Sequence, residues 1–261
     1  MVKLVANLTT LFNEVPMVER FALARAAGFR NVEVLFPHED DLHALAAAAH
    51  EGDLRVILSN FAAGNRAAGD RGITAHPARV ADFREEVARA IEIAEVLGSD
   101  RFHCMAGRRL DDISPEMQWA TMIENLRYAA GEFAPHGLTV QLEPLNDRDN
   151  PGYFLVGSAM GLRAIAELGL PNVKLQYDIY HMQRGEGELA TTIAQHLDQI
   201  GHIQIADNPG RHQPGTGEIN YRFLLPYLDR IGYGGYVGLE YGPLGPTQDS
   251  FGWIAEYELG L

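Results

Sequence analysis

The chain has 261 residues, 46% of them hydrophobic, and a formal net charge of −14 at pH 7. A length near 250 residues suits one α/β barrel, and we expect a single domain over residues 1–261. The negative charge disfavours nucleic acids and anionic membrane surfaces as partners, because their phosphate groups would be repelled. No apolar stretch reaches the roughly 18 residues that span a bilayer, so we expect no membrane association. A small-molecule substrate is favoured instead.

The redox compartment follows from cysteine usage. Cys104 is the only cysteine, which excludes an internal disulfide. Polar residues such as Asn7, Asn13 and Glu14 interrupt the segment where a signal peptide would need an apolar core. We therefore expect a cytoplasmic protein. The sequence leaves homo-oligomerisation open.

Short apolar runs alternate with longer amphipathic segments along the whole chain. In the first half the pattern predicts strands at 4–7, 32–36, 54–60 and 101–105, and helices at 16–27, 41–50, 80–94 and 115–133. In the second half it predicts strands at 140–143, 173–178, 201–205 and 236–240, and helices at 159–168, 188–199, 221–230 and 248–257. Eight strand and helix pairs indicate a parallel sheet, either closed as a barrel or open and doubly wound.

The two faces of each strand favour the closed form. Val140 and Leu142 share one face of their strand, whereas Gln141 and Glu143 share the other. Because a doubly wound sheet is covered by helices on both faces, it needs apolar residues on both. A polar second face suits the interior of a (β/α)8 TIM barrel. Within that interior Lys174 would need a carboxylate partner such as Glu33, since an unpaired buried charge is costly.

Four apolar runs in the second half each end on an oxygen-bearing side chain: Glu143, Asp178, Gln204 and Glu240. The carboxyl ends of barrel strands meet at one mouth, so we expect these four side chains to converge there. Three carboxylates would repel one another without a cation, and an all-oxygen set selects Mg²⁺ or Mn²⁺ over zinc. The alternative is that each residue caps its strand or pairs with a lysine or arginine.

Further polar residues lie at or just beyond the predicted strand ends, and we treat them as candidate substrate ligands: His181, Arg211, His212, His103 and Asn60. Arg211 follows a Gly- and Pro-containing loop that can aim its guanidinium at a substrate carboxylate. An ordinary loop role for His181, Arg211 and His212, and a core or rim role for His103 and Asn60, are the alternatives. Cys104 faces away from His103 on its strand and is expected in the core.

Several motifs are absent, which narrows the chemistry. The chain contains no dinucleotide-binding fingerprint, no P-loop and no nucleophile elbow. The segment 241–261 has no Lys or Arg, although barrels often bind phosphate there. A phosphorylated substrate is therefore disfavoured.

Local sequences at these positions resemble the hydroxypyruvate isomerase family, which belongs to the xylose-isomerase-like barrels. The motifs that carry the resemblance span nearly the whole chain: Ala6-Asn-Leu8, Phe133-Ala-Pro-His-Gly137, Leu142-Glu143-Pro144, Gln176-Tyr-Asp178-Ile-Tyr-His181, His202-Ile-Gln204-Ile-Ala206 and Gly238-Leu-Glu240-Tyr241. The resemblance implies a TIM barrel that isomerises hydroxypyruvate and tartronate semialdehyde through an enediolate.

The resemblance also implies roles for individual residues. Glu143 and Glu240 would be the proton donor and acceptor pair, and Glu143, Asp178, Gln204 and Glu240 would bind the metal. Related ketose 3-epimerases usually carry His at the position of Gln204. The alternatives are a 2-oxo-tetronate isomerase, a ketose 3-epimerase, a lyase that dehydrates an inositol-like ketone, or a sugar-acid binding protein without catalysis.

Overall fold

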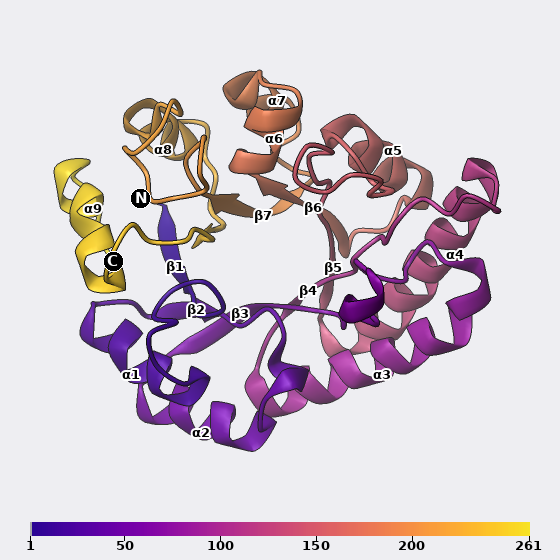
Figure 1. Cartoon of the computed structure of the whole chain (residues 1–261), viewed down its shortest axis with the longest axis horizontal. Coiled ribbons are helices and arrows are strands. Elements are labelled where there is room, and N and C mark those ends of the chain that lie inside the picture. The colour runs from indigo at the N-terminus through magenta and orange to yellow at the C-terminus, as the bar shows by residue number, and fades with distance from the viewer. Residues whose placement is uncertain (1) are drawn as a thin grey trace.

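The computed structural model describes residues 2–261, and eight parallel strands close into a barrel in chain order (Figure 1). The strands are β1 (Lys3–Asn7), β2 (Asn31–Glu33), β3 (Arg55–Asn60), β4 (Arg101–His103), β5 (Thr139–Leu142), β6 (Val173–Asp178), β7 (Ile200–Ile205) and β8 (Tyr236–Leu239). β1 pairs with both β2 and β8, which closes the ring. The predicted TIM barrel is confirmed, and the open doubly wound sheet is excluded.

Helices surround the ring of strands (Figure 1). They are α1 (Met17–Ala26), α2 (Leu42–Glu51), α3 (Val80–Leu97), α4 (Pro115–Phe133), α5 (Ser158–Leu168), α6 (Ile179–Gly185), α7 (Leu189–Gln195), α8 (Tyr221–Arg230) and α9 (Gly252–Glu256). Short 3-10 turns are η1 (Pro37–Glu39), η2 (Arg66–Ala68), η3 (Pro77–Arg79), η4 (Ala134–His136) and η5 (Thr247–Phe251). The helix predicted over 188–199 corresponds to the shorter α7. The helix α6, which precedes it, is not predicted by the sequence pattern.

The helix α4 illustrates how local sequence sets these elements. The Ser114 side chain accepts a hydrogen bond from the backbone N–H of Met117, and Pro115 occupies the first turn. Its buried stripe, which includes Trp119 and Leu126, packs in the apolar layer between helices and barrel. Because Gly137 then adopts a left-handed conformation, the chain turns back into β5.

The strand faces divide as predicted between an apolar outer layer and a polar interior. Val140 and Leu142 belong to the apolar layer under the helices, and Gln141 is fully buried on the opposite face. Cys104 is also buried, as expected for a core residue. The interior of the barrel therefore carries amides and carboxylates beneath its mouth.

The prediction that Lys174 pairs with Glu33 is wrong. Lys174 Nζ donates to the backbone oxygen of Asp198 at 2.8 Å, in an exposed position. Lys174 lies near the start of β6, so its long side chain can reach solvent at the amino end of the barrel. Glu33 is instead bound by other side chains of the interior.

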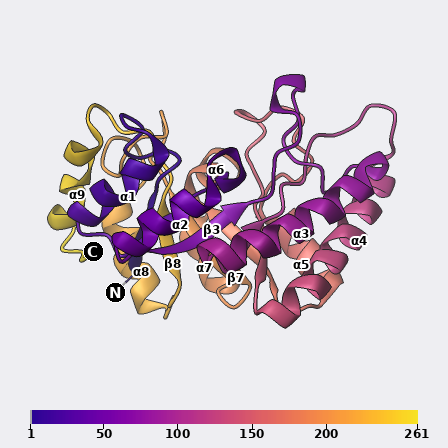
Figure 2. The same cartoon turned by 90° about the horizontal axis from the view of Figure 1, so that it is seen from below.

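The segments that follow β3 and β4 extend beyond the helices on the mouth side, as Figure 2 shows. A bridge between Gly72 and Ala106 joins these two segments. Both ends of the chain lie on one side of the molecule (Figures 1 and 2). Within residues 2–261, no helix has the length and apolar character needed to cross a membrane.

Candidate functional site

Three carboxylates and one amide from four neighbouring strands lie at the carboxyl end of the barrel. Glu143 directly follows β5, Asp178 ends β6, Gln204 lies in β7, and Glu240 directly follows β8. Asp178 and Gln204 are paired in register across β6 and β7. The side chains of Glu143, Asp178 and Gln204 are buried, so their charges and dipoles act in a poorly solvated environment.

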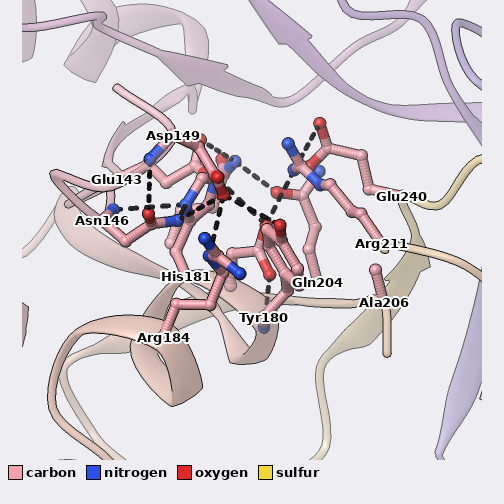
Figure 3. A network of polar contacts seen from close by, with 12 residues as sticks. Glu143, Asn146, Asp149, Tyr180, His181, Arg184, Gln204, Ala206, Arg211 and Glu240 are labelled. Carbon is pink, nitrogen blue, oxygen red and sulfur yellow. Dashed lines mark hydrogen bonds and ion pairs between the residues drawn. The ribbon is translucent and has the colours of Figure 1, made fainter. Parts of the chain in front are cut away.

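Arg211 contacts two of these carboxylates, and Figure 3 labels it beside one of them, Glu240. Its Nη2 lies 3.0 Å from Asp178 Oδ2 and 3.1 Å from Glu240 Oε1. Burial alone would lower the pKa of Arg211, but Glu240 and Asp178 raise it further than burial lowers it. The guanidinium is therefore charged. Its Nε is buried and has no hydrogen-bond partner among residues 2–261, which leaves one donor available to another molecule.

The electrostatics of the group disfavour three negative charges together. Burial, followed by repulsion from Glu240 and Asp178, holds the pKa of Glu143 well above its usual range. Burial raises the pKa of Glu240 to about 7, against the opposing effect of Arg211. Carboxylates in such a site bind either protons or a cation.

His181, in the first turn of α6, points at the carboxylates. Its Nδ1 accepts a hydrogen bond from the backbone N–H of Asn146 at 3.2 Å, and its Nε2 lies 3.7 Å from Asp178 Oδ2 and 4.0 Å from Glu143 Oε1. Burial lowers the pKa of His181 to about 4, so the ring is neutral near pH 7. Since a backbone N–H can only donate, Nδ1 accepts and the ring proton is assigned to Nε2.

A cluster of side chains that sequence reasoning missed holds His181 in place (Figure 3). Asp149 Oδ2 accepts hydrogen bonds from Tyr180 Oη at 2.8 Å and from Asn146 Nδ2 at 3.1 Å, and Arg184 Nε lies 3.0 Å away. Asn146 Nδ2 also lies 2.7 Å from His181 Nδ1. The one sequence signal for this cluster is Asp178 as an N-cap, because its carboxylate accepts from the Tyr180 N–H and so begins α6.

Two sets of side chains could coordinate a metal ion. Glu143, Asp178 and His181 carry ligand atoms that all lie within 4.8 Å of one another. The proton on Nε2 makes His181 a hydrogen-bond donor toward this space, however, and a ligating nitrogen needs a free lone pair. The oxygens of Glu143, Asp178, Gln204 and Glu240 therefore fit a hard divalent cation better.

The remaining predicted residues differ in their placement. His103 Nδ1 lies 3.2 Å from Glu143 Oε2 without the alignment of a hydrogen bond, and burial lowers the pKa of His103 to about 3. His212 Nδ1 lies 2.6 Å from the backbone oxygen of Gly242, in the segment after β8. Asn60 is buried, and its Oδ1 has no hydrogen-bond partner in the part of the chain described. The structure thus brings His103 to Glu143, whereas the contacts of His212 and Asn60 do not involve the carboxylates.

Two further interior residues link the site to the barrel below it. Gln176 Nε2 donates to Glu143 Oε2 at 3.0 Å and to Gln204 Oε1 at 2.7 Å. Gln204 Nε2 donates to Glu33 Oε2 at 2.9 Å. Gln176 was detectable in principle, because it lies two residues before Asp178 and shares its face of β6.

The class of protein is defined by a closed parallel barrel with carboxylates at neighbouring strand ends. Residues 21–257 match the family described as xylose isomerase-like TIM barrel, and the chain belongs to that family. It is 44% identical over 257 residues to the hydroxypyruvate isomerase of Escherichia coli (strain K12), a match that covers 98% of this chain and 100% of that protein. The chain is an isomerase of this family.

Two other relatives are equally informative. The 2-oxo-tetronate isomerase of Cupriavidus necator is also 44% identical over 257 residues, with 98% of this chain and 99% of that protein covered. The crystal structure of an AP endonuclease, family 2, from Brucella melitensis matches this chain with a TM-score of 0.95 and 42% identity. That alignment covers 98% of this chain and 99% of the other. Overall identity therefore does not separate the two isomerase substrates.

Proposed function

We propose that the protein is a metal-dependent isomerase that interconverts hydroxypyruvate and tartronate semialdehyde. The observation that carries the proposal is the group of Glu143, Asp178 and Glu240 at neighbouring strand ends, with the buried Gln204 beside it. The 44% identity to a protein named hydroxypyruvate isomerase supports the choice of substrate class.

The donor set fits a divalent cation. Glu143, Asp178, Gln204 and Glu240 would hold it through oxygen atoms, which favours Mg²⁺, with Mn²⁺ as the second choice. When bound, the cation would polarise the substrate carbonyl and stabilise the negative charge that develops on the two neighbouring oxygens. The pKa values of Glu143 and Glu240 are raised because negative charge is unfavourable in this site, and a bound cation would offset that cost.

Two side chains of the protein account for the proton transfer between the carbon atoms. The reaction moves one proton from C3 to C2 of hydroxypyruvate and one hydroxyl proton from O3 to O2. Glu143 and Glu240 come from β5 and β8 and lie on opposite sides of the group in Figure 3. In the proposed mechanism one of them removes the carbon proton, and the other returns a proton to the neighbouring carbon.

Two residues are proposed to orient the substrate. Arg211 would bind the substrate carboxylate, and its buried Nε, which lacks a partner among residues 2–261, provides a donor for this contact. His181 would donate from Nε2 to a substrate oxygen, since its Nδ1 already accepts from Asn146. Both contacts would hold the reacting carbons near the carboxylates.

A 2-oxo-tetronate isomerase is the second candidate, because a protein of that name is 44% identical over the same length. Its substrate is one carbon longer, so the two candidates differ in the space required and not in the proton transfers. A nuclease fits less well, because a net charge of −14 repels DNA.

The experiment is incubation of the purified protein with Mg²⁺ and hydroxypyruvate in D₂O, followed by NMR. We expect tartronate semialdehyde, and removal of the metal with EDTA should stop its formation. Parallel reactions with 2-oxo-tetronate and with hexuloses separate the three substrate classes. Turnover that survives complete chelation would contradict the metal, and turnover of hexuloses alone would replace the proposal with a ketose 3-epimerase.

A further inference from the structure

A carboxylate buried beneath the site, Glu33, has three side-chain neighbours that donate to it. Glu33 ends β2 and is fully buried. Its Oε2 accepts from Asn7 Nδ2 and from Gln204 Nε2, both at 2.9 Å, and its Oε1 lies 2.6 Å from His202 Nε2. A carboxylate in this place faces hydrogen-bond donors on every contacted side.

These contacts determine which end of the Gln204 amide faces the site. The oxygen and nitrogen ends of an amide have nearly the same size, so their partners decide the orientation. Because the Glu33 carboxylate accepts, the NH₂ end of Gln204 points down at Glu33. The oxygen end points the other way and accepts from Gln176 Nε2 at 2.7 Å.

A glycine on β8 makes room for this arrangement. Gly238 is paired in register with Gln204 across β7 and β8. A Cβ atom at Gly238 would lie 2.0 Å from Glu33 Oε1, far inside contact distance. Glu33 can therefore extend from β2 to the side chains of β7 only because position 238 has no side chain.

We propose that Glu33 is a positioning residue that fixes the Gln204 amide with its oxygen toward the divalent cation. The inference rests on the proposed function for the presence of that cation. Without Glu33 the amide can turn its NH₂ group toward the site, and a ligand is lost. Gln176 Nε2 donates both to Gln204 Oε1 and to Glu143 Oε2, so the orientation of Gln204 also sets which end of the Gln176 amide contacts a second proposed ligand.

The test is a double-mutant cycle on Mn²⁺ affinity, measured by isothermal titration calorimetry on metal-free protein. Glu33→Leu should raise the Kd for Mn²⁺ about 10- to 100-fold, the usual effect of losing a residue that orients a ligand. In the Gln204→Leu background, Glu33→Leu should raise the Kd for Mn²⁺ by less than about twofold, because the amide that Glu33 orients is absent. Gln141→Leu is the matched control, since Gln141 is equally buried and its amide has no hydrogen-bond partner among residues 2–261.

If Glu33→Leu does not fold, Gly238→Ala replaces it in the cycle, because its Cβ displaces the Glu33 carboxylate. An equal rise in Kd with and without Gln204 indicates a general structural effect and overturns the inference, while the proposed function stands. A wild-type protein that binds no Mn²⁺ contradicts the proposed function instead. In that case, the orientation of the Gln204 amide is tested by NMR of its side-chain ¹⁵N resonance. Glu33→Leu should shift this resonance, and an unchanged resonance overturns the inference.

Discussion

Replacement of Arg211 by Met tests whether this guanidinium neutralises the proposed metal ligands. The Arg211 side chain is 34% exposed, whereas its partners Asp178 and Glu240 are 1% and 13% exposed. Removing one partner of a fully buried ion pair costs about 3–5 kcal/mol, and an exposed pair is worth about 0–1 kcal/mol. Because this pair is buried only on the carboxylate side, we expect a loss of about 2 kcal/mol in the free energy of unfolding.

The assay is urea denaturation followed by circular dichroism, once in EDTA and once in saturating Mg²⁺. The loss of about 2 kcal/mol should appear in EDTA and shrink in Mg²⁺, because the divalent cation then supplies the missing positive charge. By linkage, the Met variant should bind Mg²⁺ more tightly than the wild type. Arg211→Lys is the control, since it keeps a cation near the carboxylates.

Two results would refute this reasoning. One is an equal loss of stability in EDTA and in Mg²⁺, which would mean that Arg211 and the cation do not act on the same carboxylates. The other is a Lys variant as unstable in EDTA as the Met variant, which would show that packing and not charge is lost.

Three further predictions concern catalysis and the barrel interior. Glu143→Gln and Glu240→Gln should each lower kcat by about 10²–10⁴-fold or more with an unchanged circular dichroism spectrum, and near wild-type turnover in either variant would remove that residue from the proton transfers. Asn146→Ala should lower kcat/KM about fivefold, because one hydrogen bond of about 1 kcal/mol to His181 is lost while the backbone contact stays; an unchanged kcat/KM would show that this side chain does not position His181. Lys174→Met should cost less than about 1 kcal/mol in urea denaturation, since Lys174 Nζ is exposed, and a larger loss would indicate a buried ion pair after all.

The alternation of apolar runs and amphipathic segments was sufficient to predict the barrel. The strand faces distinguished a closed sheet from an open one: Val140 and Leu142 form an apolar face, whereas Gln141 lies on a polar face. This alternation can be read from the local sequence alone. The helix α6 could not be found in this way. It begins at Ile179, directly after the last residue of β6, so Asp178 is both a strand end and an N-cap. The 7-residue helix is too short for an amphipathic repeat.

The residues around the site were harder to predict than the site itself. Strand ends identify Glu143 and Asp178 because the topology brings all strand ends together. The partners of Glu33 depend on which side chains cross the interior, and this depends on register between strands far apart in sequence. Sequence reasoning paired Glu33 with Lys174, whereas the space left by Gly238 and the donors of Gln204 and His202 determine its real position.

The amide at position 204 also has an electrostatic rationale. In the proposed metal site, Arg211 together with one divalent cation would balance the formal charges of Glu143, Asp178 and Glu240. A carboxylate at position 204, in contact with Glu33, would add a further negative charge to a poorly solvated site, at a cost of several kcal/mol. A glutamine would supply a ligand oxygen without the charge, but its NH₂ group would then have to be directed away from the cation. Glu33, placed below the site by Gly238, provides the acceptor for that group, so the neutral ligand and the buried carboxylate beneath it require each other.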